Sequence, residues 1–249
     1  LDADAVGRLL DDAASYRQAG KVAACVFRDE VHRVGNAVGV FAVRGKRIDA
    51  AKPHAEEHGI IVPGQVRELK IAAKNYYTLR IASFDFQRRD GVWQHQQRES
   101  YDIGDAAAVL PFDRARDRVI LIKQFRWPVF EWGYKHGLVE VIAGKLDGDA
   151  PLDCITREAM EEAGVTVTNP RLVTHCFISP GAVKERASMF LADYDSTAPR
   201  AKGGGHEHEG EDIEVLEMTL ADALKMIENG EIVDMKTIML LQAARLSAS

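Results

Sequence analysis

AGKLDGDAPLDCITREAMEEAGV, residues 143–165, carries the clearest structural signal in this chain of 249 residues. Residues 151–163 are predicted to form a helix, because Gly164 stands where a left-handed residue commonly follows a helix. The apolar run just before this stretch, residues 138–142, is predicted to be a short strand. A strand, a glycine-containing loop and a helix therefore follow one another directly.

The predicted helix carries a cluster of carboxylates. Glu158, Glu161 and Glu162 are spaced so that their side chains share one helix face. Carboxylates this close repel one another unless a cation lies among them, and clustered oxygen ligands suit Mg²⁺. Arg157 precedes Glu161 by one helical turn and can pair with it. The competing interpretation is a solvated acidic face, but the strand and loop before the helix would bring main-chain groups to the same place.

The segments around this helix predict an α+β fold. Two further helices are expected at 220–229 and 235–246, separated by Gly230. Strands are expected where β-branched and aromatic residues gather between turn signals: residues 76–86, 92–101, 106–112, 118–125, 172–178, 187–194 and 213–218. Many strands with a few helices predict an α+β sandwich, with a long antiparallel hairpin over residues 76–101.

The sequence around the helix resembles the Nudix family, whose signature reads G-x5-E-x7-R-E-U-x-E-E-x-G-U, with U aliphatic. The first half departs from it, because Gly144 stands one residue too near Arg157 and Asp149 replaces the first Glu. The resemblance implies an α/β/α sandwich with a mixed central sheet. The second half of the signature matches at Arg157, Glu158, Ala159, Glu161, Glu162, Gly164 and Val165.

Over residues 66–246 the chain is most similar to the Nudix branch that contains ADP-ribose and GDP-mannose pyrophosphatases, and within it to the GDP-mannose type. The resemblance implies Mg²⁺-dependent hydrolysis of a nucleoside diphosphate sugar. GDP-mannose is the first expectation, with GMP and mannose 1-phosphate as products, and ADP-ribose is the alternative. The resemblance also implies a homodimer. The supporting stretches are Asn75-Tyr76, Arg98-Glu99, Gln124-Phe125-Arg126, Ser179-Pro180-Gly181, Gly203-Gly204-Gly205, Glu211–Val215, Gly230-Glu231-Ile232 and Lys236-Thr237.

The same resemblance implies roles for individual residues. The metal, Mg²⁺ with Mn²⁺ as the alternative, is expected on Glu158, Glu162, Glu211 and the carbonyl of Ala143. Glu211 belongs to a glycine-rich acidic loop, residues 202–212, which can carry a carboxylate over the metal site once substrate is present. The alternative for this loop is an exposed acidic segment. Glu211 is the first candidate for the base that accepts the proton of water, and Glu161 is the second.

Substrate contacts are also carried over from the resemblance. Tyr76 is expected to border the guanine, and Arg98 and Arg126 can form bidentate hydrogen bonds to phosphate. Lys145 stands where an aliphatic residue is expected, which favours a main-chain contact. Each of these residues has ordinary packing or a surface position as the alternative. The full set is Tyr76, Arg98, Glu99, Arg126, Ala143, Gly144, Lys145, Glu185, Gly210 and Lys236.

His206 and His208 lie in the acidic loop. They could bind a metal such as Zn²⁺, but a two-residue spacing alone is weak evidence for a metal site. We interpret both as surface histidines.

Composition limits the class of function. The net charge of −6 and the lack of a basic stripe disfavour a nucleic-acid binder or an anionic-membrane partner. Three cysteines without CxxC spacing favour unpaired thiols in a reducing compartment. No signal peptide or membrane span is evident, so a cytoplasmic protein is expected. The alternative from a different functional class is a catalytically inactive Nudix module that binds a nucleotide. Asp149 and the short loop slightly favour this alternative, whereas the intact glutamates argue against it.

Residues 1–64 contain no chemical motif. We interpret them as an N-terminal extension, poorly packed or of unknown role. Residues 65–249 are predicted to form the Nudix hydrolase domain.

Overall fold

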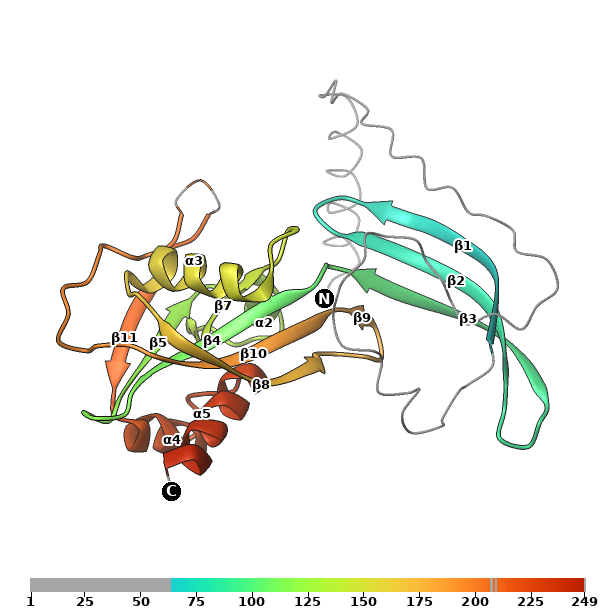
Figure 1. Cartoon of the computed structure of the whole chain (residues 1–249). Helices are drawn as coiled ribbons and strands as arrows, with labels where there is room; N and C mark the ends of the chain where they lie inside the picture. Colours follow the sequence, from blue (N-terminus) through green and yellow to red (C-terminus); the bar gives the residue numbers. More distant parts are fainter. Residues whose placement is uncertain (1–63, 207, 209, 249) are drawn as a thin grey trace. The chain divides into compact units, whose positions relative to one another are not determined.

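The computed structural model describes residues 64–206, 208 and 210–248, so the predictions for residues 1–63 lie outside it. Figure 1 shows the elements in chain order. They are β1 (Gly64–Lys74), β2 (Thr78–Gln87), β3 (Trp93–Asp102), β4 (Ala106–Asp113), β5 (Arg118–Gln124), α2 (Trp127–Glu131), β6 (Leu138–Glu140), β7 (Ile142–Lys145), α3 (Pro151–Ala163), β8 (Thr168–Phe177), β9 (Val183–Lys184), β10 (Arg186–Asp193), β11 (Glu214–Met218), α4 (Leu220–Glu228) and α5 (Met235–Ala248).

The central sheet is mixed. Its strands lie in the order β11-β5-β4-β10-β8, and β10 runs parallel to β4 while the other pairs are antiparallel. β4 and β5 pair near their turn and then separate. β6 pairs with β5 and β7 pairs with β4. The short β6–β7 segment therefore fills the split between the two strands.

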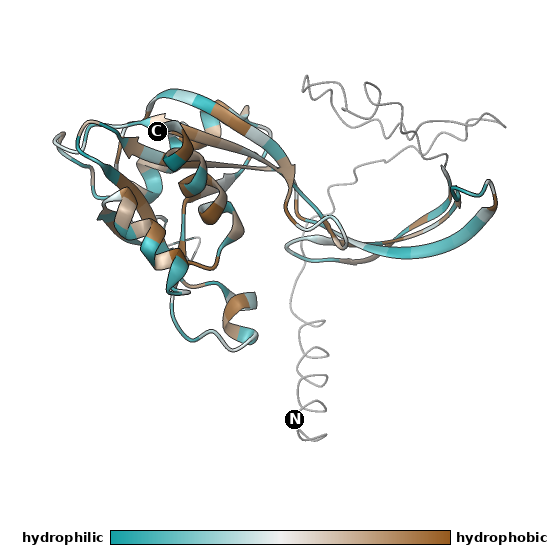
Figure 2. Ribbon diagram, turned by 90° about the horizontal axis from the view of Figure 1, so that it is seen from below, coloured by the Kyte–Doolittle hydropathy of each residue, from teal (hydrophilic) through white to brown (hydrophobic). Residues whose placement is uncertain are grey.

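Helices cover both faces of this sheet, and the alternation of side chains along the strands explains why. On β4, Val109 packs in the cluster that contains residues of α3, while Leu110 packs with residues of α4 and α5. On β5, Ile120 and Leu121 divide in the same way. A strand whose both faces are buried needs apolar residues at successive positions. Figure 2 shows that hydrophobic residues recur along the strands and helices of this part of the chain. The predicted α/β/α sandwich with a mixed sheet is confirmed.

The N-terminal strands form a second sheet, in the order β1-β2-β3-β9. The first three strands are antiparallel, and β2 and β3 form the predicted hairpin, with Thr78 opposite Asp102. β1 was not predicted from the sequence. Its residues after Gly64 are all exposed, so it lacks the half-buried pattern that marks a strand.

Helix α3 begins and ends where the sequence predicts. Pro151 stands in its first turn, and Gly164 after its end has a φ of 66°, in the left-handed region. None of the described helices combines the length and the hydropathy that a membrane crossing requires.

Some details of the sequence prediction were wrong. The strand expected at 138–142 is two strands with a break at Val141, and Gly144 lies on β7 rather than in the following loop. Tyr76 lies in the bend between β1 and β2 rather than in a strand. Helix α2 was missed because five residues are too few to show helical periodicity, and β9 has two residues.

Candidate active site

The carboxylates of α3 lie against β7. Glu162 is 2% exposed, and one of its carboxylate oxygens accepts a hydrogen bond from the Ala143 amide at 3.2 Å. Gly144 follows Ala143, and a Cβ added there would overlap the Glu158 carboxylate. Glycine is therefore required at this position for β7 to approach α3 so closely. The absence of that side chain leaves room for Glu158.

Arg157 organises the outer glutamates. Its Nη1 lies 2.9 Å from Glu158 and 2.8 Å from Glu161, which confirms the expected pairing with Glu161. Its Nε lies 3.7 Å from Asp149, the residue that replaces the first glutamate of the signature. Asp149 thus contacts the same arginine from the loop. These ion pairs place a protein cation beside the carboxylate cluster.

The electrostatics of the cluster favour a bound cation. Burial raises the pKa of Glu162 to about 9, and the charges of Glu158 and Glu211 add to the effect. Burial also raises the pKa of Glu158, although Arg157 opposes it. Within the described residues, no three His, Cys, Asp or Glu side chains converge closely enough to form a complete metal site. A divalent cation would nevertheless fit this donor set, because it would offset the cost of ionising a buried carboxylate.

The acidic loop lies against the end of α3 (Figure 1). The amides of Gly204 and Gly205 donate to the carbonyls of Glu162 and Glu161, at 2.8 and 3.0 Å. The His206 amide donates to the Glu211 carboxylate at 3.0 Å. These bonds bring Glu211 to the same end of the helix as Glu162. The described part of the loop is therefore hydrogen-bonded to α3 at Gly204 and Gly205, while Gly210 is exposed.

His206 is only partly a surface residue. Its side chain is 43% exposed, but its Nε2 lies 3.4 Å from Glu161. Its ring also stacks on that of His208, with the centroids 6.0 Å apart. The interpretation of His206 as an ordinary surface histidine was therefore incomplete.

A second charged group lies around Glu140, on β6. Glu140 is 3% exposed and pairs with Arg126 at 2.7 Å and with Lys236 at 3.5 Å. Lys236 also pairs with Asp234 at 2.7 Å. Burial lowers the pKa of Arg126, but the negative charges of Glu140, Glu162 and Glu211 together raise it by more. The contributions of Glu162 and Glu211 show that this group adjoins the carboxylate cluster.

Glu185 belongs to the same region. Burial raises its pKa, while the charge of Lys236 lowers it. Sequence reasoning found Arg126, Lys236 and Glu185 but missed Glu140 and Asp234. A charged residue inside the apolar run 138–142 was the signal for Glu140. Asp234 accepts from the Thr237 amide at 2.9 Å, as a residue that caps the start of α5 would.

A third group joins Tyr76 to Lys145. The ammonium of Lys145 lies 4.2 Å from the ring centroid of Tyr76 and 4.1 Å from that of Tyr77. Tyr76 is 83% exposed, so strand packing does not account for its aromatic ring. Sequence reasoning missed Tyr77.

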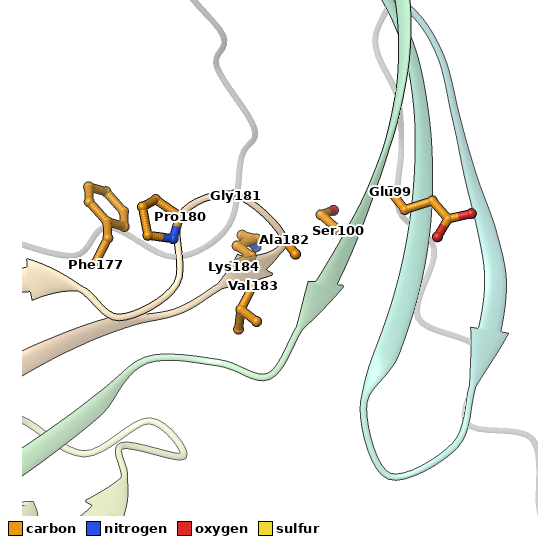
Figure 3. Close-up of a pocket in the computed structure, with 8 residues that line it drawn as sticks. All are labelled: Glu99, Ser100, Phe177, Pro180, Gly181, Ala182, Val183 and Lys184. Atoms are coloured by element: carbon orange, nitrogen blue, oxygen red, sulfur yellow. The ribbon is translucent and has the colours of Figure 1, made fainter. Parts of the chain in front are cut away.

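The two residues predicted on β3 stand apart from these groups. Arg98 is exposed and donates to the carbonyl of its neighbour Gln97 at 2.8 Å. Glu99 borders a pocket of about 360 Å³, but its carboxylate points away from the facing segment Pro180–Lys184 (Figure 3). Glu185 is the next residue after that segment. Because the Arg98 guanidinium is bonded to Gln97, the described chain does not bring Arg98 into the carboxylate cluster.

Comparison with known proteins places this geometry in a family. The model described as the GDP-mannose pyrophosphatase NudK N-terminal domain matches residues 65–101, and the model of the NUDIX domain matches residues 102–238. A protein named GDP-mannose pyrophosphatase from Pectobacterium atrosepticum is 43% identical over 183 residues, which cover 73% of this chain and 94% of the relative. A protein of the same name from Escherichia coli is 41% identical over 179 residues, covering 72% and 93%.

The fold also matches a solved structure. The crystal structure of an ADP compounds hydrolase superposes with a TM-score of 0.56 and covers 73% of this chain and 92% of its own. Its sequence identity is 17%, so the likeness concerns the fold.

Proposed function

Because this chain belongs to the Nudix family, we propose that it hydrolyses the diphosphate bond of GDP-mannose to give GMP and mannose 1-phosphate. The observation that supports this most directly is the buried carboxylate of Glu162, which accepts a hydrogen bond from the Ala143 amide and feels the negative charge of Glu158. The relatives named GDP-mannose pyrophosphatase support the choice of substrate.

A divalent cation belongs to this proposal, with Mg²⁺ as the first choice and Mn²⁺ as the alternative. Glu158, Glu162, Glu211 and the carbonyl of Ala143 would hold it. When bound, such a cation neutralises diphosphate charge and lowers the pKa of a bound water. The raised pKa values of Glu158 and Glu162 support this assignment, since burial opposes the ionisation of both carboxylates more than the nearby Arg157 and Arg126 favour it.

The side chains of the protein would carry the proton transfer. Water attacks phosphorus, its P–O bond forms as the bridging P–O bond breaks, and its proton passes to a carboxylate. Glu211 is the first candidate for that carboxylate, because the loop amide of His206 holds it beside the α3 cluster. Glu161 is the second candidate. Arg157, bonded to both Glu158 and Glu161, orients the pair.

The charged group around Glu140 would bind the substrate. Arg126 and Lys236 both pair with Glu140, and Arg126 is 42% exposed, so its guanidinium remains accessible to a phosphate oxygen. Glu185 would accept from a sugar hydroxyl or a base nitrogen. Ala143, Gly144 and Gly210 would contribute main-chain contacts, and Arg98 and Glu99 would contact substrate from β3.

The test is a substrate panel run with Glu162→Gln. Purified protein with Mg²⁺ receives GDP-mannose, ADP-ribose and other sugar nucleotides, and released monophosphates are measured with a coupled phosphatase. We expect GDP-mannose to give the highest kcat/KM. Glu162→Gln should lower kcat at least about a hundredfold, because metal-based stabilisation is worth several kcal/mol.

The control is Glu228→Gln, an exposed glutamate of α4, which should keep wild-type turnover. Preference for ADP-ribose would replace the substrate, and no turnover of any sugar nucleotide would support the inactive module instead. Wild-type activity in Glu162→Gln would remove the metal assignment.

The assembly and the compartment are part of the same proposal. We expect a homodimer, in which the N-terminal strands of one subunit complete the site of the other, since Arg98 and Glu99 lie apart from their own carboxylate cluster. We also expect a cytoplasmic protein. Cys154 and Cys176 are free thiols, which is consistent with a reducing compartment.

A further inference from the structure

Val141 lies where the chain leaves one neighbouring strand and joins another. Strand β6 pairs with β5 as far as Glu140, and β7 pairs with β4 from Ile142 onward. Within the described strands, Val141 belongs to neither ladder, and it is fully buried. A buried amide without a partner is costly. The break between β6 and β7 therefore needs a hydrogen-bond acceptor from outside the sheet.

Thr237, near the start of α5, supplies that acceptor. Its side chain is fully buried, and its hydroxyl oxygen accepts from the Val141 amide at 2.8 Å. The same hydroxyl donates to the Asp234 carboxylate at 2.6 Å, and the Thr237 amide donates to it at 2.9 Å. A hydroxyl has one hydrogen to donate and two lone pairs. Because the hydrogen is used on Asp234, the hydroxyl is held with a lone pair toward Val141.

A second contact joins the same two segments. Lys236 precedes Thr237 on α5, and its ammonium pairs at 3.5 Å with Glu140, which precedes Val141. Two neighbouring residues of the helix thus bond two neighbouring residues of the strand segment. The side chain of Ala143 also packs against the hydrophobic cluster to which α5 contributes. Helix α5 therefore fixes the path of the chain from Glu140 to Ala143.

Ala143 is the residue on which this arrangement acts, two places after Val141. Its amide donates to the Glu162 carboxylate at 3.2 Å, so it points away from Ala108, its partner on β4. In an antiparallel pair, a residue whose amide points away from the neighbouring strand turns its carbonyl the same way. Both main-chain groups of Ala143 therefore face the side from which Glu162 approaches. A shift of the strand at Val141 would move that carbonyl.

We propose that Thr237 is a positioning residue for the divalent cation, because its bond to Val141 holds the Ala143 carbonyl beside Glu162. The inference rests on the proposed function, from which it takes the cation and its ligands. Thr237 acts through the main chain and is not itself a ligand. Hydrogen-bond partners that orient metal ligands typically change metal affinity by about ten- to a hundredfold.

The test compares Thr237→Val, which keeps the shape and loses the hydroxyl, with Thr237→Ser, which keeps the hydroxyl. Each protein is titrated with Mn²⁺ in the absence of substrate, and free Mn²⁺ is measured by electron paramagnetic resonance. We expect Thr237→Val to raise the dissociation constant about tenfold, and Thr237→Ser to stay within about twofold of the wild type.

Turnover of GDP-mannose gives a second measurement. In Thr237→Val the half-saturating Mg²⁺ concentration should also rise about tenfold, while KM for GDP-mannose at saturating Mg²⁺ stays within about twofold of the wild type. A general loss of structure would not separate these two quantities. If Thr237→Val does not fold, Thr237→Ala takes its place with the same expected results.

The matched control is Ser196→Ala. It removes another hydroxyl that donates to a buried carboxylate, that of Asp113, at the end of β4 away from β7. Ser196→Ala should keep the wild-type affinity for Mn²⁺, even where its melting temperature falls as far as that of Thr237→Val.

Three results would overturn the inference: wild-type Mn²⁺ affinity in Thr237→Val, an equal loss in Thr237→Val and Thr237→Ser, or a wild-type protein that binds no Mn²⁺. If Thr237→Val alone loses Mn²⁺ affinity but the wild type hydrolyses no sugar nucleotide, the inference holds and the proposed function fails. If the wild type and Thr237→Val hydrolyse GDP-mannose with the same Mg²⁺ dependence, the proposed function stands and the inference fails.

Discussion

Glu162 stands in an environment that opposes its own ionisation. It is almost completely buried, and Glu158 and Glu211 bring further negative charge. The compensation visible in the described chain is one amide hydrogen bond from Ala143 and the charge of Arg126. A residue of this kind destabilises the metal-free protein at neutral pH and becomes useful when a cation binds.

This predicts how stability depends on pH without metal. Burial raises the pKa of Glu162 from 4.5 to about 9. Between these values the unfolded chain releases the proton while the folded protein keeps it, so the free energy of unfolding falls as pH rises. Glu162→Gln has no such proton. In EDTA, the melting temperature of the variant minus that of the wild type should grow by about 5 °C from pH 5 to pH 8.5.

Differential scanning calorimetry measures this difference directly. A difference that stays constant over the pH range would show that Glu162 ionises freely in the folded protein. Addition of Mg²⁺ at pH 8 should raise the melting temperature of the wild type and leave that of the variant nearly unchanged, because ligands stabilise the state that binds them.

At the scale of elements, the site depends on how closely β7 approaches α3. The short β6–β7 segment pairs with β5 and β4, and this pairing sets the position of Ala143 and Gly144. Thr237 on α5 stabilises the break between β6 and β7, since its hydroxyl accepts a hydrogen bond from the Val141 amide at 2.8 Å. The acidic loop is bonded to the end of α3, where the amides of Gly204 and Gly205 donate to the carbonyls of Glu162 and Glu161.

Gly144→Ala tests the strand–helix approach. The added methyl group occupies the position of the Glu158 carboxylate, so that side chain must turn away. We expect kcat to fall about a hundredfold and the half-saturating Mg²⁺ concentration to rise, with the circular dichroism spectrum unchanged. Steady-state kinetics over a Mg²⁺ titration measures both quantities.

Gly181→Ala is the matched control, because a Cβ there meets open space and the residue has no positive φ. It should retain wild-type kinetics. Normal activity in Gly144→Ala would mean that Glu158 is not needed where the structure holds it.

At the scale of the whole molecule, the residues predicted on the N-terminal sheet differ in what they contact within the described chain. Tyr76 meets Lys145, whereas Arg98 turns back to Gln97. We propose that residues 65–249 act as one Nudix domain and that Arg98 serves a second copy of it.

This proposal predicts the mass in solution. Sedimentation equilibrium should give about twice the chain mass of 27.5 kDa. Mixing an inactive Glu162→Gln subunit with an inactive Arg98→Ala subunit should restore part of the activity, because one shared site then receives both intact groups. A monomer that turns over GDP-mannose at the full rate would contradict the shared site.

Local order along the chain was enough to predict helix α3, its glycine end and the shared face of Glu158, Glu161 and Glu162, since helical spacing and capping depend on neighbours in sequence. The alternating strands of the central sheet followed from the same kind of pattern. Strand β1 could not be predicted in this way, because it is exposed on both faces. Helix α2 could not be predicted either, because its five residues are too few to show a helical period.

Folding in three dimensions settled what spacing could not. It placed Gly144 on a strand against Glu158, brought buried Glu140 between Arg126 and Lys236, and turned Lys145 toward two tyrosines. These contacts join residues far apart along the chain, and their partners are chosen by strand pairing and the packing of layers. Charge spacing reveals carboxylates that can share a cation, but burial, which raises the pKa of Glu162, exists only once the sheet and helix have met.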